Sequence, residues 1–167
     1  MLLNLLETWK NIYQDIEDAE VLLGLALEES DKEIENEVAT LLSILEKKIK
    51  KFSIQITLND EDDARDALVS INAGAGGTDS QDWAEMLFRM YTRWIDKKGY
   101  KYQVIDYQSG DEAGIKGATL RVSGVNCYGF MKVESGVHRL VRISPYNASG
   151  KRHTSFASVF VYPEIKD

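Results

Sequence analysis

Residues 67–94 read ALVSINAGAGGTDSQDWAEMLFRMYTRW, in which a strand pattern, a glycine-rich turn and a helix pattern follow one another directly. The first seven residues are typical of a β-strand. After the glycines, apolar side chains recur at helical spacing, which predicts a helix from about Ser80 to Lys98. Its core-facing side chains should be Trp83, Met86, Leu87, Met90, Tyr91 and Trp94. A strand joined to one long helix predicts a sheet covered by a helix.

Downstream segments predict the remainder of that sheet. Runs with β-branched and aromatic side chains, separated by turn-forming residues such as SGDEAG, are typical of strands. We expect these strands at 101–108, 115–124, 126–133 and 154–164. Together with the long helix they predict an α/β sheet-plus-helix domain over residues 58–167.

The residues upstream of this domain show helical patterns and no strand pattern. Apolar side chains follow helical spacing over residues 2–27 and again from Ile34 to Phe52, and Ser30 to Glu33 form a capping-box pattern between them. A short connection predicts an antiparallel hairpin, which forms a partial helical domain over residues 1–57. The acidic stretch LNDEDDARD, 58–66, is the expected linker, and the fold class of the chain is α+β.

Composition excludes several classes of protein. The single cysteine, Cys127, forms no internal disulfide, and we expect it to be buried and inert in a reducing cytoplasm. Two histidines and one cysteine far apart in sequence predict no metal site, and no cofactor is expected. No run approaches the roughly 18 apolar residues of a membrane span, and the first residues lack the pattern of a secretory signal.

The charge of −7 is distributed unevenly along the chain. Residues 1–67 hold 17 acidic and 7 basic side chains, whereas residues 68–167 hold 10 acidic and 13 basic ones. The stretch RLVRISPYNASGKRHTS, 139–155, carries four arginine or lysine side chains and no acid. Such a cluster predicts an anionic partner, and in this stretch tyrosine and histidine rings could stack on unpaired bases. The alternative interpretation is an ordinary surface loop.

The glycine-rich turn does not match a nucleotide-binding motif. No lysine follows Gly77, and Asp79 occupies the third glycine position of a dinucleotide fingerprint counted from Gly74. Asp79 and Asp82 would also repel a phosphate at the start of the helix. The turn is therefore either a capped strand-to-helix junction or a place where glycine backbone and a carboxylate meet a nucleobase edge. A general acid–base pair of the two aspartates is the remaining, less supported alternative.

Three long segments resemble the bacterial peptide chain release factors: GAGGTDSQDWAEMLFRMYTRW, DEAGIKGATLRVSG and YGFMKVESGVHRLVRISPYNASGKRHTSFASVFVYPE. The similarity extends almost continuously over residues 68–164. It implies an N-terminal helical domain, a codon-reading α+β domain, and a separate domain that bears Gly-Gly-Gln and promotes hydrolysis of the peptidyl-tRNA ester. No Gly-Gly-Gln occurs in this chain, so we expect a fragment of a longer factor that is not itself an enzyme.

The resemblance also assigns residues to the codon. Ser144, Pro145 and Tyr146 match the family's Ser-Pro-Phe, whose serine faces the second base. His153 would stack between the second and third bases, and Thr154 would contact the third. The backbone of Val141 would complete the pocket formed with His153 and Thr154. Gly76 and Asp79 would meet the first uridine, and Arg139 would support Asp82. Tyr146 replaces phenylalanine and Asp79 replaces the common glutamate, which puts the fidelity of reading in doubt.

The implied partner is the ribosome, at the rRNA of the decoding centre and the stop codon of the mRNA, with UGA and UAA as the codons read. The helical hairpin would contact ribosomal proteins or rRNA, and the chain would act as a cytoplasmic monomer without a membrane. Two alternatives remain open: a codon-blind ribosome-rescue or RNA-binding relative, and a protein-interaction module.

Overall fold

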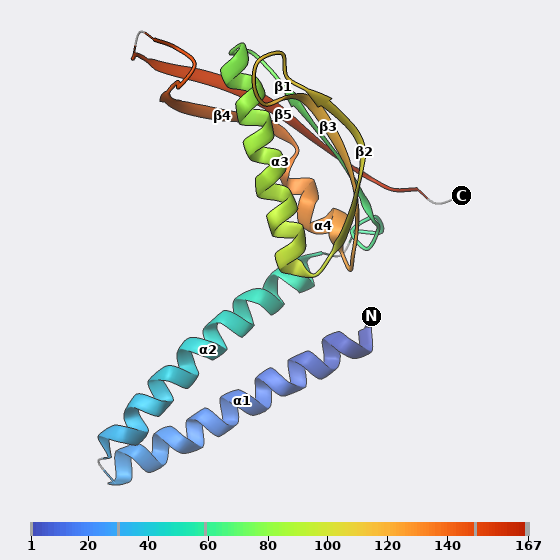
Figure 1. Ribbon diagram of the computed structural model, residues 1–167. Helices are drawn as coiled ribbons and strands as arrows, with labels where there is room; N and C mark the ends of the chain where they lie inside the picture. The colour runs from blue at the N-terminus through green and yellow to red at the C-terminus, as the bar shows by residue number, and fades with distance from the viewer. Residues whose placement is uncertain (1, 30, 59, 149, 166–167) are drawn as a thin grey trace. The chain divides into compact units, whose positions relative to one another are not determined.

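The computed structural model describes residues 2–29, 31–58, 60–148 and 150–165. The chain divides into two compact units, Met1–Thr57 and Leu58–Asp167 (Figure 1). Within the described residues, no helix combines the length and apolar character needed to cross a membrane.

The first unit is a helical hairpin of α1 (Leu2–Glu29) and α2 (Lys32–Thr57), which run antiparallel in Figure 1. Their contact face buries five apolar side chains at helical spacing: Ile12, Ala19, Ala26, Val38 and Leu45. Asp31 caps α2, because its Oδ1 accepts a hydrogen bond of 2.8 Å from the Glu33 amide. The expected cap Ser30 lies outside the described residues. The predicted antiparallel hairpin is confirmed.

The second unit is a five-stranded antiparallel sheet with the order β2-β3-β1-β5-β4. Its strands are β1 (Ala67–Ala73), β2 (Lys101–Ser109), β3 (Ile115–Ser123), β4 (Gly136–Ile143) and β5 (Arg152–Pro163). The central strand, β1, pairs with β3 on one side and with β5 on the other. The α+β class and three of the four downstream strands are thereby confirmed.

The long helix α3 (Thr78–Lys98) packs against one face of the sheet (Figure 1). Alternate residues of β1, from Ala67 to Ile71, are fully buried beneath it. The helix contributes Leu87, Tyr91 and Ile95 to the same core. Of the six side chains predicted to face the core, Met90 is the exception, since it is 47% exposed.

The strand predicted at 126–133 is wrong. These residues form the short helix α4 (Cys127–Met131), which continues into a 3-10 turn, η1 (Lys132–Glu134). The buried side chains Cys127 and Met131 stand four positions apart, which is the spacing of one helix face. Aromatic content favoured a strand in the sequence, but this one-turn helix packs into the core instead.

The acidic stretch 58–66, expected as a linker, packs onto the second unit. Lys132 Nζ forms ion pairs with Asp60 (2.5 Å) and with Asp63 (2.6 Å). The backbone amide of Gly129 donates to the Asp63 carbonyl at 3.1 Å. A Cβ on Gly129 would lie 2.9 Å from the Asp63 Cβ, so the glycine allows this close approach. Most of the stretch is therefore fixed in place.

The thiol of Cys127 is fully buried, and burial raises its pKa to about 12. Because the thiolate is the reactive form, we expect labelling by iodoacetamide at pH 8 to be at least 100-fold slower than for the unfolded chain. Labelling with and without guanidinium, followed by mass spectrometry, measures the ratio. Native-state labelling at the unfolded rate would contradict the burial of this side chain.

Candidate functional site

A glycine turn joins β1 to α3 and is fixed to β5. The Gly74 amide donates to the Phe156 carbonyl at 2.8 Å, and the Phe156 amide donates to the Ala75 carbonyl at 2.9 Å. Gly76 has a φ of 137°, and a Cβ there would lie 2.6 Å from Ser155 Oγ. Only glycine therefore fits this close contact between the turn and the strand.

The first turn of α3 is capped by backbone alone. Gly77 occupies the N-cap position with a φ of 60°, and no side chain forms a cap hydrogen bond. The Gly77 carbonyl accepts hydrogen bonds from the Ser80 amide at 3.0 Å and from Ser80 Oγ at 2.7 Å. No side chain therefore caps this strand-to-helix junction, which leaves Asp79 free to make tertiary contacts.

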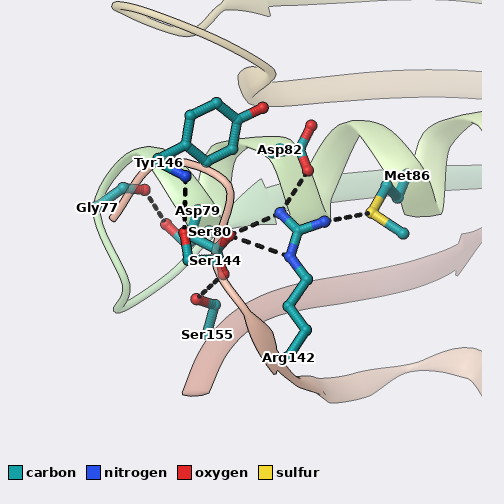
Figure 2. A network of polar contacts seen from close by, with 9 residues as sticks. All are labelled: Gly77, Asp79, Ser80, Asp82, Met86, Arg142, Ser144, Tyr146 and Ser155. Carbon is teal, nitrogen blue, oxygen red and sulfur yellow. Dashed lines mark hydrogen bonds and ion pairs between the residues drawn. The ribbon is translucent and has the colours of Figure 1, made fainter. Parts of the chain in front are cut away.

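Arg142 of β4 bridges the two aspartates of α3, as Figure 2 shows. Its Nη2 lies 2.6 Å from Asp79 Oδ1 and 2.6 Å from Asp82 Oδ2, and its Nε donates to Asp79 Oδ1 at 3.1 Å. The side chain of Asp79 is only 6% exposed and that of Asp82 is 16% exposed. A guanidinium satisfies this nearly buried pair of carboxylates, which would otherwise repel each other.

Asp79 also accepts a hydrogen bond of 2.7 Å from Ser155 Oγ, which is buried in β5. Burial by itself raises the pKa of Asp79, but hydrogen bonds from Ser155, Arg142 and Ser144 outweigh it, so the pKa lies below the usual value. The carboxylate is therefore ionised at neutral pH and serves as an acceptor. It joins α3, β4 and β5 at one point.

Ser144 and Tyr146 follow β4 and lie over the start of α3 (Figure 2). Ser144 is 5% exposed, and its Oγ accepts a hydrogen bond of 3.2 Å from the Tyr146 amide. Pro145 between them is exposed, and the ring of Tyr146 is 44% exposed. Burial and the nearby Asp82 carboxylate raise the pKa of Tyr146. In this conformation the serine hydroxyl is turned inward, and the partly exposed tyrosine ring lies over the start of α3 with its hydroxyl near Asp82.

His153 closes the other end of the loop. It stands opposite Arg142 in the ladder between β4 and β5, is half-buried, and its Nε2 contacts Asn147 Nδ2. Val141 and Thr154 form the neighbouring pair, whose side chains point to the opposite face of the two strands. The structure thus brings Ser144 together with Asp79 and the glycine turn, and it places Thr154 and Val141 on the other face.

The expected support of Asp82 by Arg139 is not formed. Arg139 is exposed, and none of the described residues forms a side-chain hydrogen bond or ion pair with it, whereas Arg142 binds Asp82. The two arginines are three residues apart on one strand, so their side chains point to opposite faces. The basic composition of residues 139–143 suggests a loop, but these residues belong to β4, whose alternation places Arg142 and not Arg139 beside Asp82.

Two residues of the site, Arg142 and Ser155, had no assigned role in the sequence analysis. The sequence feature that could have identified them is the alternation of side chains along β4 and β5. Even positions of β4 and odd positions of β5 face α3. That periodicity points both side chains at the first turn of the helix, where two aspartates stand three positions apart.

Comparison with known proteins identifies relatives that match nearly the whole chain. A family model described as the PCRF domain matches residues 1–159. Peptide chain release factor 2 of Petrotoga mobilis is 50% identical over 97% of this chain and 44% of its own length. The same-named protein of Clostridium perfringens is 51% identical over 96% of this chain and 44% of its own length. The chain thus spans less than half the length of these relatives.

A solved structure also matches the architecture. RF2 of Thermus thermophilus superimposes with a TM-score of 0.74 at 42% identity, over 96% of this chain and 46% of that chain. At this identity and coverage, the likeness supports both the fold and the relationship.

Proposed function

Because the chain belongs to the PCRF-domain family of the peptide chain release factors, we propose that it reads the stop codons UGA and UAA in the ribosomal A site during translation termination. The observation that carries the proposal is the meeting of Ser144, Asp79 and the glycine turn at the start of α3. These groups offer a hydroxyl, a carboxylate and unshielded backbone to the edges of unpaired bases, which is how single-stranded RNA is recognised.

Ser144 would explain why either adenine or guanine is accepted as the second base of the codon. A hydroxyl can rotate to donate or accept, so Ser144 can meet either the amino group of adenine or the carbonyl oxygen of guanine. In the structure this hydroxyl is engaged with the Tyr146 amide, and it contributes to the lowered pKa of Asp79. Reading a base therefore requires it to exchange these partners for the codon, so we propose that the loop rearranges when the codon binds.

The remaining proposed contacts follow the family pattern. His153 stacks between the second and third bases, the Thr154 hydroxyl contacts the third, and the Val141 backbone lies beside them. Gly76 and Asp79 meet the first uridine. Pro145 holds Ser144 in an extended conformation, and Tyr146 supplies an exposed ring at the tip. Asp82 and Arg142 orient Asp79 and do not touch the codon.

The chain contains no Gly-Gly-Gln, and we propose that these 167 residues bind the codon without catalysing ester hydrolysis. The partners are the rRNA of the decoding centre and the mRNA, in the cytoplasm, with the chain acting as a monomer and without a cofactor. The helical hairpin contacts ribosomal protein or rRNA away from the codon. Affinity for an isolated trinucleotide should be very weak, because so few contacts do not offset the entropy of association.

Titration of ribosomes with the 167-residue chain tests the proposal. With UGA or UAA in the A site we expect roughly tenfold tighter binding than with UAG or a sense codon, the equivalent of one recognition contact. Ser144→Ala and His153→Ala should abolish most of this difference, whereas Ser53→Ala, at an exposed position of α2, should preserve it. A fluorescently labelled chain provides the measurement.

Other outcomes separate the alternatives. Equal affinity for stop and sense codons would indicate a codon-blind ribosome-rescue or RNA-binding relative. Binding that does not weaken as salt rises would indicate a protein-interaction module, since phosphate contacts weaken steeply with salt.

A further inference from the structure

A hollow lies on the sheet-and-helix unit, along the C-terminal half of α3. It has a volume of about 240 Å³ and is lined by Met90, Tyr91, Trp94, Phe130, Met131 and Glu134. Tyr91 is twelve residues from Asp79 on the same helix, which corresponds to about 18 Å along the axis. The hollow is thus separate from the proposed codon site, and it is smaller than the roughly 300–1,000 Å³ of typical small-molecule pockets. Its size suits a single side chain.

The lining combines aromatic faces with one carboxylate. Trp94 and Phe130 meet edge to face, with ring centroids 6.4 Å apart. Tyr91 is buried, and its hydroxyl donates to Glu134 Oε2 at 2.9 Å. Of the side-chain hydrogen bonds among the described residues, only this one reaches the Glu134 carboxylate, so Oε1 can accept from a ligand. Aromatic faces and an anionic oxygen both attract cations.

A cation of the chain itself, Lys98, already lies over the aromatic rings of this hollow. Lys98 Nζ lies 4.5 Å from the centroid of Phe130 and 5.5 Å from that of Trp94. The side chain is exposed, at the last residue of α3, and no ion pair in the described part of the chain holds it. A flexible, solvated ammonium therefore covers a surface that favours cations but can be displaced from it.

We propose that this hollow binds an arginine side chain from a basic segment of a partner protein, which replaces Lys98 over the aromatic rings. A planar guanidinium stacks on Trp94 or Phe130 and donates to Glu134 Oε1. Its methylene stem packs on the thioethers of Met90 and Met131, which adapt to irregular shapes. The inference is independent of codon reading. A phosphate-bearing ligand is disfavoured because Glu134 would repel it.

The test uses the 167-residue chain labelled with 5-fluorotryptophan, so that Trp9, Trp83 and Trp94 give separate fluorine NMR signals. The probe is the peptide acetyl-Gly-Leu-Arg-Leu-Gly-amide, and its neutral control carries citrulline in place of arginine. We expect a saturable shift of the Trp94 signal with the arginine peptide, and at least fivefold weaker binding of the citrulline peptide. No saturable shift at millimolar peptide would overturn the proposal.

Two variants give opposite expected effects. Lys98→Gln removes the competing cation and should strengthen binding at least threefold, whereas Glu134→Gln should weaken it at least fivefold while retaining an oxygen that accepts from Tyr91. Lys98 is exposed, so its substitution keeps the test valid even if Glu134→Gln fails to fold. Unchanged or weaker binding by Lys98→Gln would overturn the proposal. So would displacement of the peptide by a uridine hexanucleotide, which would indicate a nucleic-acid surface.

Discussion

Arg142→Met is expected to destabilise the sheet-and-helix unit by about 3 kcal/mol at pH 7, since removing one partner of a largely buried ion pair leaves the other charge uncompensated. Arg142 is the only cation within ion-pair distance of Asp79 and Asp82 among the described residues, and both carboxylates are mostly shielded from water. The proposed stop-codon binding should fall with it, by roughly 100-fold, because Asp79 and the loop after β4 lose their common anchor.

The control for this variant is Arg139→Met, the same substitution three residues earlier on the same strand. Arg139 points to the opposite face and is exposed, so its loss should change the unfolding free energy by less than about 0.5 kcal/mol. Adding Asp79→Asn to Arg142→Met should recover part of the loss by removing the uncompensated charge. Urea unfolding of all four proteins measures these differences, and equal effects of the two arginine substitutions would contradict the ion-pair assignment.

The pH dependence follows from the direction of the pKa shift. The pKa of Asp79 is lowered in the folded chain, so its contribution to stability is fully present above the unfolded value near 3.8 and is lost as pH falls through the lower folded value. Arg142→Met removes the hydrogen bond and the positive charge of Arg142, both of which lower the pKa of Asp79, so this pKa should rise in the variant. The stability difference between wild type and variant should therefore shrink below about pH 4.

Gly114→Ala is expected to destabilise the same unit by about 3–4 kcal/mol, the sum of left-handed backbone strain and a steric clash. Gly114 has a φ of 68° and ends the turn between β2 and β3. A Cβ there would lie 2.2 Å from the backbone carbon and oxygen of Gln81 and 2.3 Å from the Asp82 nitrogen. The first turn of α3 would have to move, and it carries the aspartates bound by Arg142.

Gly99→Ala provides a matched control. Gly99 ends α3 with a φ of 71°, and no atom lies within 4 Å of a Cβ built there, so alanine adds the strain without the clash. Its expected cost is about 1–2 kcal/mol. In a Trp9→Phe background the remaining tryptophans, Trp83 and Trp94, report unfolding of residues 58–167 alone. Equal destabilisation by Gly114→Ala and Gly99→Ala would show that a Cβ at position 114 does not clash with the first turn of α3.

Periodicity made most of the fold predictable. The stripes in α1, α2 and α3 continue over several turns, and β1 and β5 are flanked by clear turn residues, so local pattern and tertiary structure agree. The helix α4 was missed because five residues hold too little periodicity to separate a helical turn from a strand. Strand β4 was missed because its basic side chains suggested a loop, although alternate residues face α3.

The site was predictable as a set of residues but not as a set of contacts. The basic stretch and the glycine turn could be identified from composition and from the resemblance, yet their meeting depends on the pairing of β4 with β5. Which arginine reaches Asp82 is decided by strand register, and a shift of one residue reverses every side chain. The inward hydroxyl of Ser144 likewise depends on Asp79, which lies 65 positions earlier in the chain.

The position of β1 at the centre of the sheet has a consequence for biosynthesis. Ala67 pairs with Pro163, 96 positions later, so one edge of this apolar strand has no neighbour until the end of β5 has been synthesised. The hairpin of α1 and α2 is a compact unit within residues 1–57, so it can form while the rest of the chain is still being made. A nascent chain halted before β5 would display an open, aggregation-prone strand edge, which is the kind of surface that chaperones capture.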